Sequence, residues 1–301
     1  MTEDFSEIKW FLCEIEKKYP FFKKSKEYID LNFKKNYLEF SNVILKDYFG
    51  NDVEKKSKAI DSFIKYSNEF LFLQVKLKKT GRYLYQTFSE IEENVYQSKL
   101  MDDYYLDGLL LSQFFWPNHY KILEHLQCHV ANSSYSSVLD APCGSGLQAA
   151  VIASEIPGAK IDCVDLSPFS LNFTRRLIDG LGMGHKSLTY KVQNIFDTTG
   201  KYDFICCGEL LEHLESPTTL LATLKSLLNQ DGRIYLTTAI YAAAIDHLYL
   251  FHSVKEVRDM IKEFFYIESE IILPVSLKQF NEEIVDEPIN YAAILKHRCV
   301  E

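Results

Sequence analysis

The sequence lacks both a hydrophobic run long enough to cross a membrane and an excess of positive charge. It begins with the acidic, polar residues Met-Thr-Glu-Asp-Phe-Ser, so we expect neither a signal peptide nor a membrane partner. Its formal net charge is −9 at pH 7, whereas general nucleic-acid binders carry a strongly basic surface. Nucleic acid is therefore not an expected partner, although a local basic patch is compatible with this charge.

Cysteine pairs at metal-binding or redox spacing are also missing. The seven cysteines include no Cys-x-x-Cys pair, and Cys163, Cys206 and Cys207 lie in apolar runs typical of strands. This usage predicts reduced, buried thiols and a cytoplasmic protein. Internal repeats and low-complexity linkers are absent too, and the polar stretch 131–137 is the nearest to a joint. We therefore expect a helical domain over residues 1–130 and a second domain over residues 131–301.

Aromatic residues are abundant, with 19 Tyr and 21 Phe, which allows a large core or an aromatic-lined pocket. The first domain repeats apolar side chains at helical spacing, as in Phe5, Ile8 and Leu12. Aromatic side chains are densest over residues 101–120. This stretch either packs the helices against the second domain or forms a lid that excludes water from a pocket. In the second interpretation, the substrate contacts are Tyr104, Tyr105, Trp116 and His119.

The second domain is organised around residues 137–146. Val138 and Leu139 end a predicted buried strand, Asp140 follows at its tip, and a glycine-containing turn leads into a helix from Leu147. A strand, a glycine turn and a helix form the first half of a nucleotide-binding unit, although unrelated α/β domains can contain such a turn. The third glycine of the dinucleotide fingerprint G-x-G-x-x-G is absent. A dehydrogenase is therefore not favoured.

Further strands follow this unit along the chain. They are predicted at residues 159–165, 187–193, 202–207, 233–238, 266–275 and 290–297. The second strand ends in Asp165, where a doubly wound fold places a carboxylate for ribose hydroxyls. A helix is predicted from Pro217 to about Leu228, with Gly232 ending it. The last two strands are predicted to form a long hairpin.

Four of these segments resemble, in order, the motifs of class I S-adenosylmethionine-dependent methyltransferases. They are Asp140-Ala-Pro-Cys-Gly-Ser-Gly, Val164-Asp165-Leu166-Ser167, Tyr202-Asp-Phe-Ile leading to Glu209-Leu-Leu-Glu-His-Leu, and Leu228-Asn-Gln-Asp-Gly-Arg-Ile-Tyr-Leu. The resemblance implies an α/β fold with a doubly wound, seven-stranded Rossmann-like sheet and an antiparallel last strand, plus the helical N-terminal domain. It also implies S-adenosylmethionine as the cofactor.

The resemblance further implies donor contacts at the strand tips. These are Asp140, Ala141, Pro142, Cys143, Gly144, Gly146, Asp165, Leu166, Asn194, Ile195, Glu209 and Leu210. In this family, Asp165 would accept the ribose hydroxyls, and Glu209 would face the methyl group. Asn194 stands where many members have an acid, and its side-chain carbonyl would take over the contact with the adenine amino group.

The catalytic candidates are Glu209, His213 and His247. Glu209-Leu-Leu-Glu212-His213 followed by His247 resembles the metal site of small-RNA 2′-O-methyltransferases and of some quinone-precursor O-methyltransferases. Those four residues would then hold a divalent metal. We expect a metal-free site, in which His247 or His213 acts as general base, and a structural role for His213 is equally open. Tyr241 and Asp246 are expected to join the acceptor site.

The leading hypothesis is methyl transfer from S-adenosylmethionine to an oxygen or nitrogen of a small-molecule metabolite or natural-product intermediate. The enzyme would be a monomer or a homodimer. One alternative is a metal-assisted RNA 2′-O- or protein-directed methyltransferase, which a basic groove beside Glu209 would favour. Another is a protein that binds the donor without transferring its methyl group.

Overall fold

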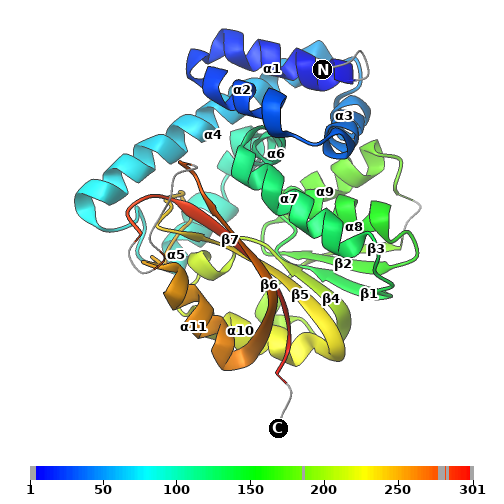
Figure 1. The fold of residues 1–301 in the computed structure, drawn as a ribbon, viewed down its shortest axis with the longest axis vertical. Helices are drawn as coiled ribbons and strands as arrows, with labels where there is room; N and C mark the ends of the chain where they lie inside the picture. The colour runs from blue at the N-terminus through cyan, green and yellow to red at the C-terminus, as the bar shows by residue number, and fades with distance from the viewer. Residues whose placement is uncertain (1–4, 185–186, 277–281, 283–284, 299–301) are drawn as a thin grey trace.

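A seven-stranded sheet forms the centre of the computed structural model, which describes residues 5–184, 187–276, 282 and 285–298 (Figure 1). The strand order is β3-β2-β1-β4-β5-β7-β6, and β7 runs antiparallel to both of its neighbours. The strands are β1 (Ser137–Asp140), β2 (Lys160–Asp165), β3 (Leu188–Val192), β4 (Tyr202–Cys207), β5 (Leu228–Ile240), β6 (Phe265–Pro274) and β7 (Ile289–His297). The predicted doubly wound sheet with an antiparallel last strand is confirmed.

Helices cover both faces of the sheet (Figure 1). α7 (Pro117–Val130), α8 (Leu147–Glu155) and α9 (Pro168–Gly180) pack on one face, and α10 (Pro217–Leu227) and α11 (Val254–Phe264) on the other. Strand β4 shows why, because its alternate side chains enter different cores. Phe204 and Cys206 join the α7–α9 side, while Ile205 and Cys207 join the α10–α11 side.

Most of the N-terminal helices gather at one end of the molecule, and the short helix Phe88–Ile91 lies apart from them (Figure 1). The N-terminal helices are α1 (Ser6–Lys18), α2 (Lys23–Asn32), α3 (Lys35–Phe49), α4 (Val53–Thr80), α5 (Phe88–Ile91) and α6 (Leu106–Phe115). Their buried side chains form one continuous hydrophobic cluster with the α7–α9 face of the sheet. The two expected domains thus share a core, and a boundary between residues 130 and 131 remains a prediction. Across the described ranges, no helix is both long and apolar enough to span a bilayer.

Two π-helical turns interrupt the segment between α4 and α6. One covers Glu92–Tyr96 and the other Met101–Tyr105. Such turns are rare and frequently occur at functional sites. Each turn ends in a tyrosine, Tyr96 or Tyr105, that reaches the loops at the strand tips.

The prediction that Gly232 ends a helix is wrong. α10 ends at Leu227, and β5 begins at the next residue and runs to Ile240. Gly232 lies inside β5, where the register with β4 shifts. A Cβ there would lie 2.7 Å from Leu228 Cδ1 and 3.0 Å from the carbonyl oxygen of Asp203. Glycine is needed here because two backbones approach closely, and not because a helix stops.

Candidate functional site

The strand tips open into a cavity of about 790 Å³. One wall contains most of the predicted donor contacts: Ala141, Pro142, Cys143, Gly144, Asp165, Leu166, Asn194, Ile195, Glu209 and Leu210. The opposite wall comes from the N-terminal region and is rich in aromatic side chains, among them Tyr28, Phe63, Tyr66, Phe70, Tyr105 and Trp116. Two predicted donor contacts, Asp140 and Gly146, lie behind the first wall. A donor and an acceptor could therefore share one enclosed space.

The turn after β1 is shaped by two glycines in the left-handed region, Gly144 (φ +50°) and Gly146 (φ +77°). The N–H of Gly144 donates a hydrogen bond to Asp165 Oδ2 at 3.0 Å. A Cβ on Gly146 would lie 2.7 Å from Thr174 Cγ2 in α9. Gly146 therefore permits close packing of the turn against α9, while Gly144 leaves the backbone open to a ligand.

Two carboxyl groups lie beside this turn. Asp165 accepts hydrogen bonds from the N–H groups of Gly144 and Ser167. Burial nevertheless raises the pKa of Asp165 to about 6. Asp140 is fully buried, and neither of its oxygens has a hydrogen-bond partner among the described residues. Burial, followed by the charge of Asp165, raises the pKa of Asp140 to about 8. The charge of Asp165 thus disfavours ionisation of Asp140.

Asn194 lies at the expected adenine position, but its side-chain oxygen already has a partner. It accepts a hydrogen bond from the Phe196 N–H at 3.1 Å and so caps the short turn Ile195–Asp197. An amide oxygen has two lone pairs, so a second donor can still bind. The predicted adenine contact remains a prediction.

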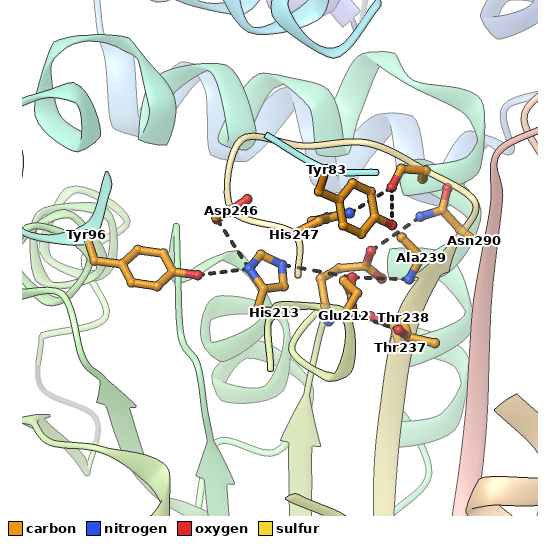
Figure 2. Close-up of polar contacts among 12 residues, drawn as sticks. Tyr83, Tyr96, Glu212, His213, Thr237, Thr238, Ala239, Asp246, His247 and Asn290 are labelled. Carbon is orange, nitrogen blue, oxygen red and sulfur yellow. Dashed lines mark hydrogen bonds and ion pairs between the residues drawn. The ribbon is translucent and has the colours of Figure 1, made fainter. Parts of the chain in front are cut away.

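The residues after β4 and β5 form a buried polar cluster (Figure 2). Glu212 is its anchor, because its carboxylate accepts hydrogen bonds from the Thr238 hydroxyl at 2.6 Å and the Ala239 N–H at 3.1 Å. Its carbonyl oxygen also accepts from the N–H groups of Leu248 and Tyr249. Glu212 therefore ties the turn after β4 to β5 and to the loop that carries His247.

His213 lies among carboxyl groups that favour its protonated form. Its Nδ1 lies 2.9 Å from the Tyr96 hydroxyl and 3.4 Å from Asp246 Oδ2. Burial alone would lower the pKa of His213, but the carboxylates of Asp246, Glu212 and Glu209 raise it to about 9. Conversely, burial would raise the pKa of Asp246, but His213 lowers it to about 2. The raised pKa favours the imidazolium, which does not accept a proton, and the general-base role of His213 stays a prediction.

The surroundings of His247 favour its neutral form instead. Its Nδ1 lies 2.8 Å from the carbonyl oxygen of Ala242. A carbonyl only accepts hydrogen bonds, so Nδ1 carries the hydrogen and Nε2 keeps its lone pair. Burial and the charge of His213 lower the pKa of His247. A neutral ring with an available Nε2 suits a proton acceptor.

Glu209 lies at the tip of β4 with a strained backbone (φ +49°). Its N–H donates to the carbonyl oxygen of Thr237, and its Oε2 lies 3.5 Å from Asn290 Nδ2. Its buried Oε1 has no hydrogen-bond partner in the described part of the chain. Burial, followed by the charge of Glu212, raises the pKa of Glu209 well above its usual range. Leaving a buried oxygen without a partner costs free energy, and a ligand in the cavity would supply one for Glu209 Oε1.

This cluster fits a divalent metal. Glu212, His213 and His247 offer ligand atoms within 4.8 Å of one another, and Glu209 Oε1 is unpaired. A histidine that binds a metal usually donates its other ring N–H to a carbonyl or carboxylate. His247 has such a bond to Ala242, and His213 faces Asp246. A bound metal would displace the proton from His213 and could polarise a hydroxyl.

The predicted acceptor contacts divide into two groups. Tyr105, Trp116, His119 and Asp246 line the cavity, and burial lowers the pKa of His119 to about 4. Tyr104 and Tyr241 do not line it. The Tyr104 hydroxyl turns instead to Glu69, at 2.9 and 3.0 Å, and the Tyr241 side chain packs against the α10–α11 core.

Several polar residues at the site carry no sequence signal. Asn290 accepts a hydrogen bond from Asn118, 172 residues away along the chain, and Tyr96 is 117 residues from His213. Tyr83 and Gln74 likewise bond to the loop after β5. These residues belong to no motif, and only the fold brings them to the strand tips.

Comparison with known proteins finds methyltransferase relatives for the part of the chain that contains the strand tips. Residues 139–234 match a family model described as a methyltransferase domain. A ubiquinone biosynthesis O-methyltransferase of Xanthomonas oryzae pv. oryzae (strain PXO99A) is 33% identical over 105 residues, which are 34% of this chain and 42% of that protein. A protein of the same description from Pasteurella multocida (strain Pm70) is 33% identical over 111 residues, 34% of this chain and 45% of that one. The match thus spans less than half of either relative.

A solved structure shares the fold over a longer range. The mitomycin 7-O-methyltransferase MmcR superimposes with a TM-score of 0.52 at 13% sequence identity, covering 85% of this chain and 75% of that one. At this identity the likeness concerns the fold alone. It extends into the N-terminal region, because 85% of the chain is more than residues 131–301 contain.

Proposed function

We propose that this protein, whose residues 139–234 match a methyltransferase domain, transfers the methyl group of S-adenosylmethionine to an oxygen or nitrogen of a small molecule. One observation carries the proposal. A single cavity of about 790 Å³ runs from the strand tips, where the donor motif lies, to the aromatic wall of the N-terminal region. Such a space can hold a donor and an acceptor in contact and exclude water.

In this proposal the donor supplies the electrophilic methyl group and the leaving group. The chain binds and orients both substrates. Asp165 holds the ribose hydroxyls beside Gly144, and Leu166 and Ile195 enclose the adenine. His247 takes the proton from the acceptor through Nε2, since its Nδ1 is bonded to Ala242.

The acceptor in this proposal is a small, largely aromatic molecule without a strong negative charge. Lys24 is the only lysine or arginine among the described residues that line the cavity, and the positive charge favoured on His213 is offset by its neighbour Asp246. This charge distribution disfavours RNA and other anionic acceptors. The relatives named above are O-methyltransferases, which supports oxygen as the acceptor atom.

The free thiols of six described cysteines support a cytoplasmic location.

A metal-assisted reaction is the second candidate. It is supported by the Nδ1 contacts of His213 and His247 with Asp246 and Ala242. The metal would be held by Glu209, Glu212, His213 and His247, and both histidines would then be ligands and not bases. Measuring methyl transfer after chelation and dialysis separates the two versions. Full activity without added metal excludes the metal-assisted version, while a loss that Mg²⁺, Mn²⁺ or Zn²⁺ restores supports it.

The proposal is tested first by calorimetric titration with S-adenosylmethionine and S-adenosylhomocysteine. We expect wild-type binding in the micromolar range, about −8 kcal/mol, and a loss of at least about tenfold in Asp165→Ala. Asp162→Asn is the matched control, because Asp162 lies on the same strand but does not line the cavity. Acceptors are then screened with a labelled methyl group. If the wild type binds neither nucleoside, the proposed function is wrong.

A further inference from the structure

Three tyrosine hydroxyls from the N-terminal region contact a site histidine or one of its hydrogen-bond partners. Figure 2 shows Tyr96 beside Nδ1 of His213. Tyr83 donates to the carbonyl oxygen of Ala242, and Tyr105 donates to Asp246. None of the three belongs to the donor motifs. Their hydroxyls converge on one cluster although they come from three different turns of the chain.

Tyr83 acts on His247 through a shared acceptor. The Ala242 carbonyl oxygen lies 2.9 Å from the Tyr83 hydroxyl and 2.8 Å from His247 Nδ1. The ring of Tyr83 also stands edge-on to the His247 ring, with centroids 5.4 Å apart. Gln74 bonds to the peptide groups on both sides, since it donates to the Tyr241 carbonyl at 2.9 Å and accepts from the Ala243 N–H at 2.8 Å. The carbonyl that fixes the tautomer of His247 is therefore held from the N-terminal region.

Tyr96 and Tyr105 act on His213. The Tyr96 hydroxyl lies 2.9 Å from His213 Nδ1, and the Tyr105 hydroxyl donates to Asp246 Oδ2 at 3.0 Å. Asp246 Oδ2 in turn lies 3.4 Å from the same Nδ1. Each tyrosine is the last residue of a π-helical turn. The two turns thus place two hydroxyls on one side of the His213 ring.

We propose that Tyr83, Tyr96 and Tyr105 are positioning residues, which act from the N-terminal region to fix the ring orientation of His213 and the ring orientation and tautomer of His247. This inference rests on the proposed function only in assigning the histidines a part in methyl transfer. It holds whether the histidines bind a metal or one of them accepts a proton, because both roles need a fixed ring. The same N-terminal region thus supplies both the aromatic wall of the cavity and the hydroxyls that position the histidines.

The test is a histidine NMR experiment on the whole chain. Ring ¹⁵N and ¹H signals are recorded with ¹⁵N-labelled histidine for the wild type and for Tyr83→Phe, Tyr96→Phe and Tyr105→Phe, each of which removes one hydroxyl. Tyr235→Phe is the matched control, because Tyr235 is buried and its hydroxyl bonds to the carbonyl oxygen of Ile122, away from the cluster. His213→Gln and His247→Gln assign the two rings.

We expect Tyr83→Phe to shift the His247 ring signals, and Tyr96→Phe and Tyr105→Phe to shift those of His213. Tyr235→Phe should shift neither ring. The inference is overturned if the three variants leave both rings unchanged, or if Tyr235→Phe shifts them equally. Because the tyrosines have separate partners, a variant that does not fold leaves the other two to decide.

Kinetics add a second readout. With an acceptor from the labelled-methyl screen, we expect kcat to fall about 10- to 100-fold in each tyrosine variant, the usual effect of losing such an outer contact. Calorimetric binding of S-adenosylhomocysteine should stay within about twofold of wild type, because the hydroxyls do not contact the predicted donor site. If the wild type binds no nucleoside, the proposed function fails, yet the NMR signals still decide the role of the tyrosines.

Discussion

Gly146 allows a sharp test of why the donor turn has its sequence. Alanine at this position must adopt φ +77°, and its Cβ would lie 2.7 Å from Thr174 Cγ2 and 2.8 Å from Thr174 Cα. The left-handed backbone costs about 1–2 kcal/mol for a residue with a Cβ. Overpacking against α9 adds about 1–3 kcal/mol. We therefore expect Gly146→Ala to lower the free energy of unfolding by about 2–5 kcal/mol.

Gly81 provides the control, because it adopts φ +68° and a Cβ there would meet nothing within 4 Å. Gly81→Ala should therefore lose only the backbone part, about 1–2 kcal/mol. Urea unfolding of both variants measures the two losses, and their difference isolates the contact with Thr174. Equal destabilisation of the two variants would refute the packing argument. Calorimetry should also show weaker S-adenosylhomocysteine binding in Gly146→Ala and unchanged binding in Gly81→Ala.

Three other substitutions test the scaffold of the site. Asp203 accepts hydrogen bonds from Ser136, Ser137 and Asn229, which lower its pKa. The stabilisation that these bonds give is present above the unfolded pKa of about 3.9 and is lost as the pH falls through the lower folded pKa. In urea titrations, Asp203→Asn should therefore lower the free energy of unfolding by about 1–3 kcal/mol at pH 7 and by less below about pH 4. Gln74→Met keeps the volume but removes both bonds to the loop after β5, so hydrogen exchange of residues 239–250 should accelerate, and unchanged exchange would contradict the clamp. Thr238→Val removes a hydrogen bond from the buried Glu212 carboxylate and should lower the free energy of unfolding by about 1–3 kcal/mol, whereas Thr223→Val, on the exposed side of α10, should lower it by less than about 0.5 kcal/mol.

The sheet could be predicted because its signals are local. Each of β1, β2 and β4 is a short apolar run followed by a turn, so Asp140, Asp165 and Glu209 had to meet at one edge. The start of β5 could not be predicted in the same way. Residues 229–232 are polar and contain a glycine, so they carry no local strand signal, although β5 includes them and Gly232 lies close to the Asp203 backbone.

The acceptor side was harder to predict because its residues have no periodic pattern. Aromatic density alone suggested Tyr104 and Tyr105, yet these neighbours diverge. The Tyr105 hydroxyl reaches Asp246, whereas the Tyr104 hydroxyl reaches Glu69. A π-helical turn decides which of the two faces the cavity, and this turn has no recognisable sequence signature. The protonation states of His213 and His247 also depend on partners far away along the chain.

The shared core of the N-terminal helices and the α7–α9 face has a consequence for how molecules enter and leave. A rigid-body movement of residues 5–130 away from the sheet would expose the apolar side chains that the shared hydrophobic cluster buries. Substrates and products are therefore expected to enter and leave through the rim of the cavity. Among the described lining residues, Phe21 is 84% exposed, Leu71 52% and Val275 42%, which places the mouth beside them. The exchange of product for fresh substrate is then governed by a few surface side chains, whose replacement would change release rates while leaving the folded core intact.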